Sequence, residues 1–253
     1  MKIVPISAFR DNYIWAVCSD THCALVDPGQ AEPAQAFLDR NGLTLAAILV
    51  THRHSDHVGG IETLLARTPG TPVYGPADED IPARTHALCD GAIVDLAELG
   101  RYTVLAVPGH TEGHIAYHGE HALFCGDTLF AAGCGRVLGG TASQLHASLQ
   151  RLAALPADTR IYCAHEYTLS NLRFAQTVEP DNAAITLRQA ACMALRERGE
   201  PTLPARLAEE WETNPFLRVH LPAVQARAAD HAGSIPIDAP AVFAVLRSWK
   251  DHF

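Results

Sequence analysis

Short apolar segments that end at a histidine or an aspartate recur along the first two-thirds of this 253-residue chain. TLAAILV leads into His52, YTVLAVPG into His110, ALFCG into Asp127 and RIYCA into His165. Several of these segments are rich in β-branched or aromatic residues, as buried strands are. Because ligand-binding residues of α/β sheets lie at the carboxyl ends of strands, we expect these polar side chains to meet at one sheet edge.

The segments between these runs predict helices, so the first part of the chain has a mixed α/β character. We expect strands at 13–17, 24–26, 46–50, 103–107, 122–125 and 161–164, and helices at 33–42, 61–68 and 141–155. The first of these helices begins with a proline and stops at Gly42, which is the usual asymmetry of helix ends. Strands mixed with helices in this way indicate a layered α/β domain.

The sequence pattern changes at about Thr168, from mixed strands and helices to helices alone. Helical patterns then follow one another, with proline and glycine at the breaks, at 169–178, 182–200, 204–212 and 240–253. We therefore predict a catalytic domain at 1–167 and a small all-helical domain at 168–253.

Charge and composition exclude several classes of partner and environment. The net charge is -9, with 19 Lys and Arg against 28 Asp and Glu, which argues against nucleic acid or an anionic membrane as a partner. No stretch of 18 apolar residues is present, and residues 1–13 lack the apolar core of a secretory signal. The seven cysteines form no CxxC pair, which fits free thiols in a reducing compartment. We expect a cytoplasmic protein that acts as a monomer.

The motif THRHSDH places four metal-type side chains, His52, His54, Asp56 and His57, within six residues. Imidazole and carboxylate are the usual ligands of zinc, manganese and iron. In an extended segment, residues i and i+2 point to the same side, so His52 and His54 can reach one ion together. Asp56 and His57 fall where the chain turns towards the next helix, and we expect them to face a second ion.

Together with the three residues at the other segment ends, the motif supplies seven candidate ligands, more than one tetrahedral site can use. Two ions that share a carboxylate account for the number. We assign His52, His54 and His110 to the first ion, Asp56, His57 and His165 to the second, and Asp127 to a bridging position. The ions are divalent, with zinc expected first and iron or manganese as alternatives. The competing interpretation, a polar loop with coincidental histidines, does not explain why four apolar segments each deliver such a residue.

On these motifs the sequence resembles the metallo-β-lactamase superfamily, through THRHSDH, PGHTEGH, CGDTLF and CAHEYT. It is more specifically similar to the hydroxyacylglutathione hydrolase (glyoxalase II) family. The motifs that carry this closer resemblance are GDTLFAAGCGR (126–136), AHEYTLSNLRFA (164–175), TNPFLR (213–218) and LRSWKDHF (246–253). The first motif is common to the whole superfamily, whereas the last group discriminates between its members.

The resemblance implies an αββα metallo-β-lactamase-like sandwich followed by a small all-helical C-terminal domain. It also implies hydrolysis of S-D-lactoylglutathione, and of related 2-hydroxyacylglutathione thioesters, to glutathione and D-lactate. That reaction is the second step of methylglyoxal detoxification, and a hydroxide that bridges two metal ions performs it. The resemblance supports the two-ion ligand assignment and implies that Asp56 and Asp127 are the catalytic carboxylates.

The resemblance further implies a glutathione-binding set, which consists of Arg136, Tyr167, Arg247 and Lys250, near Cys134. Arg247 and Lys250 have the R-x-x-K spacing of the family, and residues i and i+3 of a helix share one face. One departure concerns Leu138 and Gly139, where family members usually carry an aromatic and then an acidic residue. This departure puts the affinity for the substrate or the range of substrates in doubt.

Other functions remain open at the level of sequence. Another binuclear hydrolase of the superfamily, such as a phosphodiesterase or a lactonase, is the first alternative. A sulfur dioxygenase would need a single iron, which the complete second set of ligands argues against, and a non-catalytic metal-binding member would have lost ligands. Two further residues are candidates for holding the metal ligands in position without binding metal themselves. His114 is expected to orient a ligand, whereas Asp27 either supports the ligands or shapes the turn before Pro28.

Overall fold

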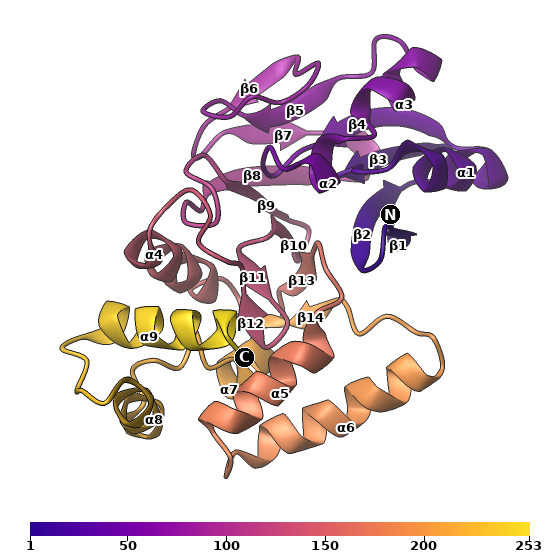
Figure 1. The fold of residues 1–253 in the computed structure, drawn as a ribbon. Helices are drawn as coiled ribbons and strands as arrows, with labels where there is room; N and C mark the ends of the chain where they lie inside the picture. Colours follow the sequence, from indigo (N-terminus) through magenta and orange to yellow (C-terminus); the bar gives the residue numbers. More distant parts are fainter. The chain divides into compact units, whose positions relative to one another are not determined.

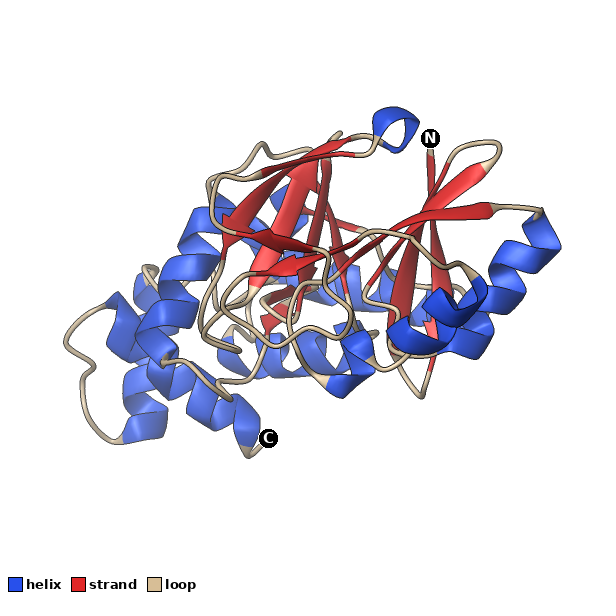
Figure 2. Cartoon of the chain, turned by 90° about the horizontal axis from the view of Figure 1, so that it is seen from above, coloured by secondary structure: helices blue, strands red, loops and turns tan.

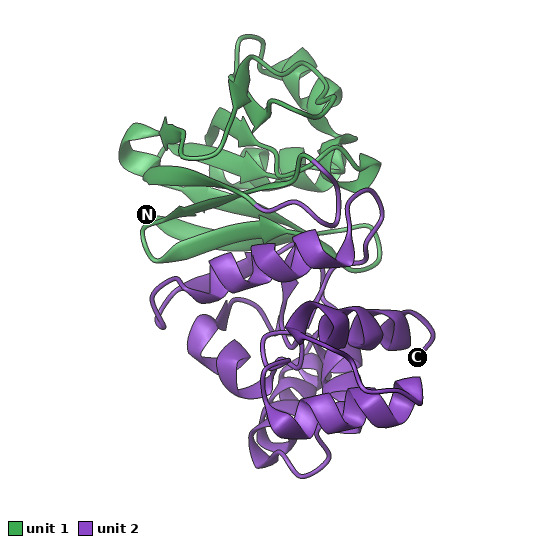
Figure 3. Cartoon of the chain, turned by 90° about the vertical axis from the view of Figure 1, so that its left-hand side faces the viewer, with its two compact units in different colours: residues 1–106, 113–126 green, residues 107–112, 127–253 purple.

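The computed structural model describes residues 1–253, and Figure 1 and Figure 2 show the helices and strands along the chain. The chain divides into two units, which Figure 3 colours separately. Unit 1 consists of residues 1–106 and 113–126, and unit 2 consists of residues 107–112 and 127–253. None of the helices combines the length and the apolar character needed to cross a bilayer.

Unit 1 contains a complete six-stranded sheet in the order β1-β2-β3-β4-β5-β6. The strands are β1 (Lys2–Ala8), β2 (Asn12–Cys18), β3 (His22–Val26), β4 (Thr44–Leu49), β5 (Val73–Pro76) and β6 (His86–Leu88). The first three strands pair antiparallel, and β3 to β6 pair parallel. Because β3 and β4 are parallel neighbours, their carboxyl ends, which lead to Asp27 and to the THRHSDH motif, lie side by side.

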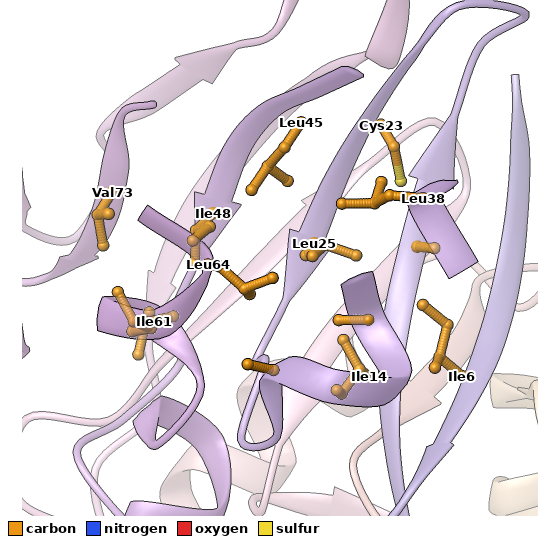
Figure 4. Close-up of a cluster of buried hydrophobic side chains, with 14 of the residues drawn as sticks. Ile6, Ile14, Cys23, Leu25, Leu38, Leu45, Ile48, Ile61, Leu64 and Val73 are labelled. Atoms are coloured by element: carbon orange, nitrogen blue, oxygen red, sulfur yellow. The ribbon is translucent and has the colours of Figure 1, made fainter. Parts of the chain in front are cut away.

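Helices α1 (Ala31–Asn41) and α3 (Ile61–Arg67) supply apolar side chains that pack on this sheet, and the short α2 (Ser55–Val58) lies between β4 and α3. Figure 4 shows Leu38 of α1 and Leu64 of α3 among side chains of β3 and β4 such as Leu25 and Ile48. Each such fully buried side chain stabilises the fold by about 1.5–3 kcal/mol relative to an exposed one. This packing fixes the sheet edge from which the polar residues project.

Four strands of unit 1 belong to a second, antiparallel sheet, in the order β10-β9-β8-β7. They are β7 (Ile93–Asp95), β8 (Arg101–Ala106), β9 (Ile115–Gly119) and β10 (Ala122–Gly126), and a 3₁₀ turn, η1 (Ala97–Leu99), precedes β8. The buried Tyr117 of β9 donates a hydrogen bond of 2.8 Å to the carbonyl of Val50, directly after β4. Burial raises the pKa of Tyr117 well above its usual value, so the phenol stays protonated and continues to donate. This bond joins the two sheets inside unit 1.

Unit 2 begins with a small hairpin and continues mainly as helices. Its strands are β11 (Leu129–Phe130), β12 (Gly133–Cys134), β13 (Arg160–Cys163) and β14 (Ala205–Arg206), of which β11 pairs with β12 and β13 with β14, both antiparallel. Its helices are α4 (Ala142–Ala153), α5 (Thr168–Val178), α6 (Ala183–Glu197), α7 (Leu207–Thr213), α8 (Pro222–Ala232) and α9 (Ala239–Asp251). Thr141 and Gln144 form a complete capping box at the start of α4, so this helix begins where the sequence predicts.

The six predicted strand segments coincide with strands, and the predicted helices coincide with α1, α3, α4, α5, α6, α7 and α9 to within a few residues. Two details differ from the expectation. Strand β4 ends at Leu49, one residue before the predicted end, and His52 and His54 lie in the loop that follows. Helix α8 was not predicted, because PAVQARAADHA is too weakly apolar to show a clear stripe. The division into domains 1–167 and 168–253 stays a prediction.

Candidate metal centre

The loop after β4 brings the first two histidines of THRHSDH together. The Nε2 atom of His52 lies 3.0 Å from the Nδ1 atom of His54. His52 is buried and His54 is half-buried, and His54 has an extended backbone just before α2. The expected same-side arrangement of residues i and i+2 therefore holds in this loop, although the strand has already ended. Two ring nitrogens at this distance can both face one cation.

Asp27, at the carboxyl end of β3, holds the beginning and the end of this motif. Its carboxylate accepts hydrogen bonds from the backbone N–H and the hydroxyl of Thr51, at 2.8 and 2.7 Å. Nδ1 of His57 lies 3.0 Å from the same carboxylate and donates to it. A proton on Nδ1 leaves the lone pair of the ring on Nε2, which is the form of histidine that binds metal. The structure thus favours the role of Asp27 as a support of the ligands.

Two residues of unit 1 that sequence reasoning did not single out also touch the motif. Asn12, at the start of β2, donates from Nδ2 to the carboxylate of Asp56 at 3.0 Å. The buried Glu79 accepts the backbone N–H groups of Arg53 at 2.6 Å and Gly113 at 3.2 Å. No sequence signal identifies Glu79, because it lies in a loop between β5 and β6 without an apolar run before it.

His114 and Gly126 show how closely packed this edge of unit 1 is. The ring of His114 is buried and stacks on the ring of His52, with centroids 4.6 Å apart and an interplanar angle of 20°. Gly126 has φ +46, and a Cβ atom there would lie 2.3 Å from Oγ1 of Thr51 and 2.9 Å from Nε2 of His114. Only glycine fits this position, directly before Asp127. His114 thus lies beside the candidate ligand His52, as expected of the supporting role that the sequence predicts for it.

Asp127 is the central carboxylate of the site in unit 2. Its Oδ2 atom lies 3.5 Å from Nε2 of His110, and its Oδ1 atom lies 3.4 Å from Nε2 of His165. The two oxygens of one side chain therefore face two different histidines. Nδ1 of His110 donates to the carbonyl of Arg136 at 2.8 Å, which again leaves the lone pair on Nε2. Each oxygen of Asp127 is thus next to one histidine ring nitrogen, and the bridging position stays a prediction.

The donor atoms of the candidate ligands form three groups, and within each group they lie within 4.8 Å of one another. The groups are His52, His54 and His110; His52, His57 and Asp127; and Asp56, His57 and His165. The first and the last group are the sets that the sequence assigns to the two ions. Imidazole and carboxylate donors of this kind fit zinc, iron or manganese.

Comparison with known proteins identifies the family. A model described as "Metallo-beta-lactamase superfamily" matches residues 8–165, and one described as "Hydroxyacylglutathione hydrolase C-terminus" matches residues 166–253. A protein of Alkalilimnicola ehrlichii named hydroxyacylglutathione hydrolase is 54% identical, over 99% of both chains. The chain belongs to the hydroxyacylglutathione hydrolase family. The resemblance inferred from the motifs is confirmed.

Solved structures support the same fold. The structure of ETHE1 from Myxococcus xanthus matches with a TM-score of 0.67 at 24% identity, over 99% of this chain and 98% of that one. The structure of TTHA1623 in a di-iron-bound form matches with a TM-score of 0.54 at 31% identity, over 64% of this chain and 91% of that one. The chain has the α/β sandwich of the metallo-β-lactamase superfamily with a C-terminal helical region, as predicted.

The structure gives the two basic residues of α9 different surroundings. Arg247 is buried, and its guanidinium donates to the carbonyl of Cys134 at 2.8 Å and to Asp251 at 3.1 Å. The ammonium of Lys250 lies 3.3 Å from the hydroxyl of Ser170. Burial, reinforced by the positive charges of Arg247 and Arg173, lowers the pKa of Lys250 to about 8. Arg247 thus holds the end of β12 in place, whereas the ammonium of Lys250 loses its positive charge as the pH rises through about 8.

The other predicted substrate residues lie near the same segment of unit 2. Arg136 is exposed and has its Nε atom 3.3 Å from the carboxylate of Asp251. The ring of Tyr167 stacks on His165, with centroids 4.7 Å apart and an interplanar angle of 5°. The thiol of Cys134 is buried, and burial raises its pKa, so a role as a nucleophile is disfavoured.

Leu138 and Gly139, the two positions that depart from the family pattern, belong to the loop that holds His110. Their backbone N–H groups both donate to the carbonyl of His110, at 3.1 and 3.0 Å. The side chain of Leu138 is exposed. The backbone of this loop therefore supports a candidate ligand whatever side chains it carries, and the departure affects only the surface that the side chains present.

Proposed function

We propose that this protein hydrolyses S-D-lactoylglutathione and related 2-hydroxyacylglutathione thioesters to glutathione and D-lactate. The observation that carries the proposal is the carboxylate of Asp127, whose two oxygens face His110 and His165, the third members of two separate ligand groups. The relatives named hydroxyacylglutathione hydrolase match over the whole chain and support the choice of a glutathione thioester. In this account the protein is a cytoplasmic monomer and performs the second step of methylglyoxal detoxification.

We propose two divalent metal ions per chain, zinc first, with iron or manganese as alternatives. His52, His54 and His110 would hold one ion, Asp56, His57 and His165 the other, and Asp127 both. Such ions supply a water of near-neutral pKa and polarise the carbonyl of the substrate. The related structure in a di-iron-bound form favours iron as the first alternative.

The residues of the chain then have separate tasks. Asp27 keeps His57 in the tautomer that binds metal, and Asn12 holds one oxygen of Asp56, so that the other oxygen can accept a hydrogen bond from the attacking water. Attack on the thioester carbonyl expels the thiolate of glutathione. Because the reference pKa of a thiol is about 8.5, this group leaves with little help from a general acid.

We propose that residues 168–253 together with the β12 segment bind the glutathione part of the substrate, and that residues 1–167 carry the chemistry. Lys250 and Arg136 would attract the carboxylates of the tripeptide, with Tyr167 packing beside them. Arg247 and Cys134 contribute through the bond that fixes the end of β12. Binding energy from this remote part positions the reacting carbonyl, which is how such contacts accelerate a reaction.

An assay with three substrates tests the proposal. We expect the purified protein to hydrolyse S-D-lactoylglutathione much faster than a phosphodiester or a lactone. Substitution His54→Ala should lower kcat/KM by more than the roughly 100-fold that the loss of an outer-shell partner costs. The matched control is Arg53→Ala, since that side chain is exposed and only its backbone N–H bonds to Glu79. Preferred cleavage of the phosphodiester or the lactone, or full activity of the His54 variant, would contradict the proposal.

A further inference from the structure

Two of the seven free cysteines lie face to face in unit 1. Cys18 is the last residue of β2, and Cys23 is the second residue of β3. They are direct partners in the antiparallel register, and their sulfur atoms lie 2.9 Å apart. Both side chains are buried, and Figure 4 shows Cys23 beside Leu38 at the edge of the apolar core.

The register places the two backbones at a distance that suits a disulfide. The N–H of Ser19 donates to the carbonyl of His22 at 2.9 Å, so these two residues form a hydrogen-bonded pair. Because such pairs alternate along an antiparallel ladder, Cys18 and Cys23 form the other, closer kind, with Cα atoms about 4.5 Å apart. Disulfides span Cα distances of about 4.4–6.8 Å. The sulfurs need to approach by less than about 1 Å to reach the bond length of about 2.05 Å.

One of the two thiols is accessible to a small reagent. Cys18 lines a surface pocket of about 590 Å³, together with Lys2, Ser19, Asp20 and Glu98. Cys23 is not among the residues that line this pocket. A reagent that enters it therefore meets Cys18 first, with Cys23 directly behind.

The pKa values of the two thiols also favour a reaction at Cys18 before Cys23. The hydrogen bond between the two thiols lowers the pKa of Cys18, against an opposing effect of burial, and the charge of Lys2 lowers it further. The same hydrogen bond and burial raise the pKa of Cys23. Since the thiolate is the reactive form, Cys18 is the thiol that reacts first with an oxidant.

We propose that Cys18 and Cys23 are a redox-active pair that hydrogen peroxide converts to an intramolecular disulfide. In the first step the sulfur of Cys18 attacks peroxide, an S–O bond forms, the O–O bond breaks, and the leaving hydroxide takes up the thiol proton as water. In the second step the sulfur of Cys23 attacks this sulfenic acid, the S–S bond forms, and the S–O bond breaks. The oxygen leaves as a second water with the proton of Cys23. The two thiols lose two electrons in total, and peroxide gains them.

The pair is independent of the proposed hydrolysis, since neither cysteine is a candidate ligand or a predicted substrate contact. A disulfide here would join neighbouring strands across a turn of four residues, Ser19 to His22. It would be transient in a reducing compartment, where glutathione and dithiol reductants reverse such bonds.

Peptide mapping of the full-length reduced protein tests the proposal. The protein is treated with increasing hydrogen peroxide, alkylated with iodoacetamide in denaturant and digested with trypsin. One tryptic peptide, residues 11–40, contains both cysteines, and another, residues 85–101, contains the exposed Cys89 as an internal reference. We expect the first peptide to lose two hydrogens and both alkylation sites at peroxide levels that leave more than half of Cys89 alkylated. Dithiothreitol should restore both sites.

Two results would overturn the proposal: oxidation of Cys89 while peptide 11–40 keeps both thiols, or a peptide with Cys18 oxidised and Cys23 still alkylated. Single variants test the order of the steps. In Cys23→Ser, Cys18 should stop as a sulfenic acid that dimedone traps, and in Cys18→Ser, Cys23 should stay reduced. Equal reactivity of Cys23 in that variant would contradict the assigned order. The wild-type measurement decides whether the disulfide forms even if a variant fails to fold.

Discussion

At the scale of single residues, the candidate site depends on hydrogen bonds that determine which nitrogen of each histidine faces the cation. Asp27 accepts one such bond, from Nδ1 of His57, and two further bonds from Thr51. The carbonyl of Arg136 does the same for His110. These partners hold no ion themselves, but they fix the tautomer and the ring orientation of the residues that would.

Substitution Asp27→Asn tests this role. An amide group has a single acceptor oxygen and cannot serve all three donors, whereas asparagine tolerates the positive φ of +52 at this position. We expect the affinity for zinc to fall by about 10–100-fold. Competition with a chelator of known affinity measures the change. The exposed Asp39→Asn, in α1, is the control and should bind zinc like the wild type.

The titration of Lys250 gives a second prediction at this scale. Burial lowers the pKa of this side chain to about 8, so its positive charge is present below pH 8 and is lost as the pH rises through that value. If the charge binds a carboxylate of glutathione, the KM for S-D-lactoylglutathione should rise above pH 8 while kcat changes less.

The matched variant Lys250→Gln lacks this titration but retains every other ionisation of enzyme and substrate. Its KM should be high at neutral pH and should not show the additional rise above pH 8. An identical pH profile of KM in the wild type and the variant would exclude a substrate contact by Lys250.

The candidate ligands could be predicted from the sequence, as could the supporting residues Asp27 and His114, but the other supporting residues could not. The histidines and aspartates follow apolar strand segments, and this pattern can be recognised in the amino-acid sequence alone. Asn12 and Glu79 reach the motif through tertiary contacts that no spacing records. The bond from Arg247 to the carbonyl of Cys134 likewise joins residues that are 113 positions apart.

At the scale of elements, one short helix holds the segment that follows Asp127. Glu210 of α7 is fully buried, accepts the backbone N–H of Ala132 at 2.8 Å, and pairs with Arg188 of α6 at 2.6 Å. Asn214, just after α7, donates to the carbonyl of Gly133 at 2.9 Å. Helix α7 thus fixes the β11–β12 hairpin by hydrogen bonds to its backbone.

Substitution Glu210→Ala should therefore be strongly destabilising. It leaves the largely buried side chain of Arg188 without its carboxylate, and removing one partner of a buried ion pair costs about 3–5 kcal/mol. Chemical denaturation monitored by circular dichroism measures the free energy of unfolding. Glu212→Ala, two positions away and exposed, should stay within about 0.5 kcal/mol of the wild type. Similar stability of both variants would show that the pair does not stabilise the hairpin.

Most of the longer elements with a clear apolar pattern were predicted, whereas very short or weakly apolar elements were not. Helix α4 has a capping box and a regular apolar face, which local sequence alone determines. Strands β11, β12 and β14 are two residues each, too short to show any alternation. The end of β4 was placed one residue late because Val50 is as apolar as the strand itself.

At the scale of the whole molecule, we propose that seven side chains from separate segments of the chain hold two cations. The fold of the superfamily and its C-terminal helical region were both expected from motifs that extend along the chain. The number of ions is the central claim, because the choice of a binuclear thioester hydrolase over a single-metal enzyme depends on it.

Titration of the metal-free protein with zinc tests this claim most directly. The protein is stripped with a chelator, zinc is added in fractions of an equivalent, and the rate of S-D-lactoylglutathione hydrolysis is followed. We predict that the rate rises until two equivalents of zinc per chain are bound and is then constant. A plateau at one equivalent, or full activity of the stripped protein, would contradict the account.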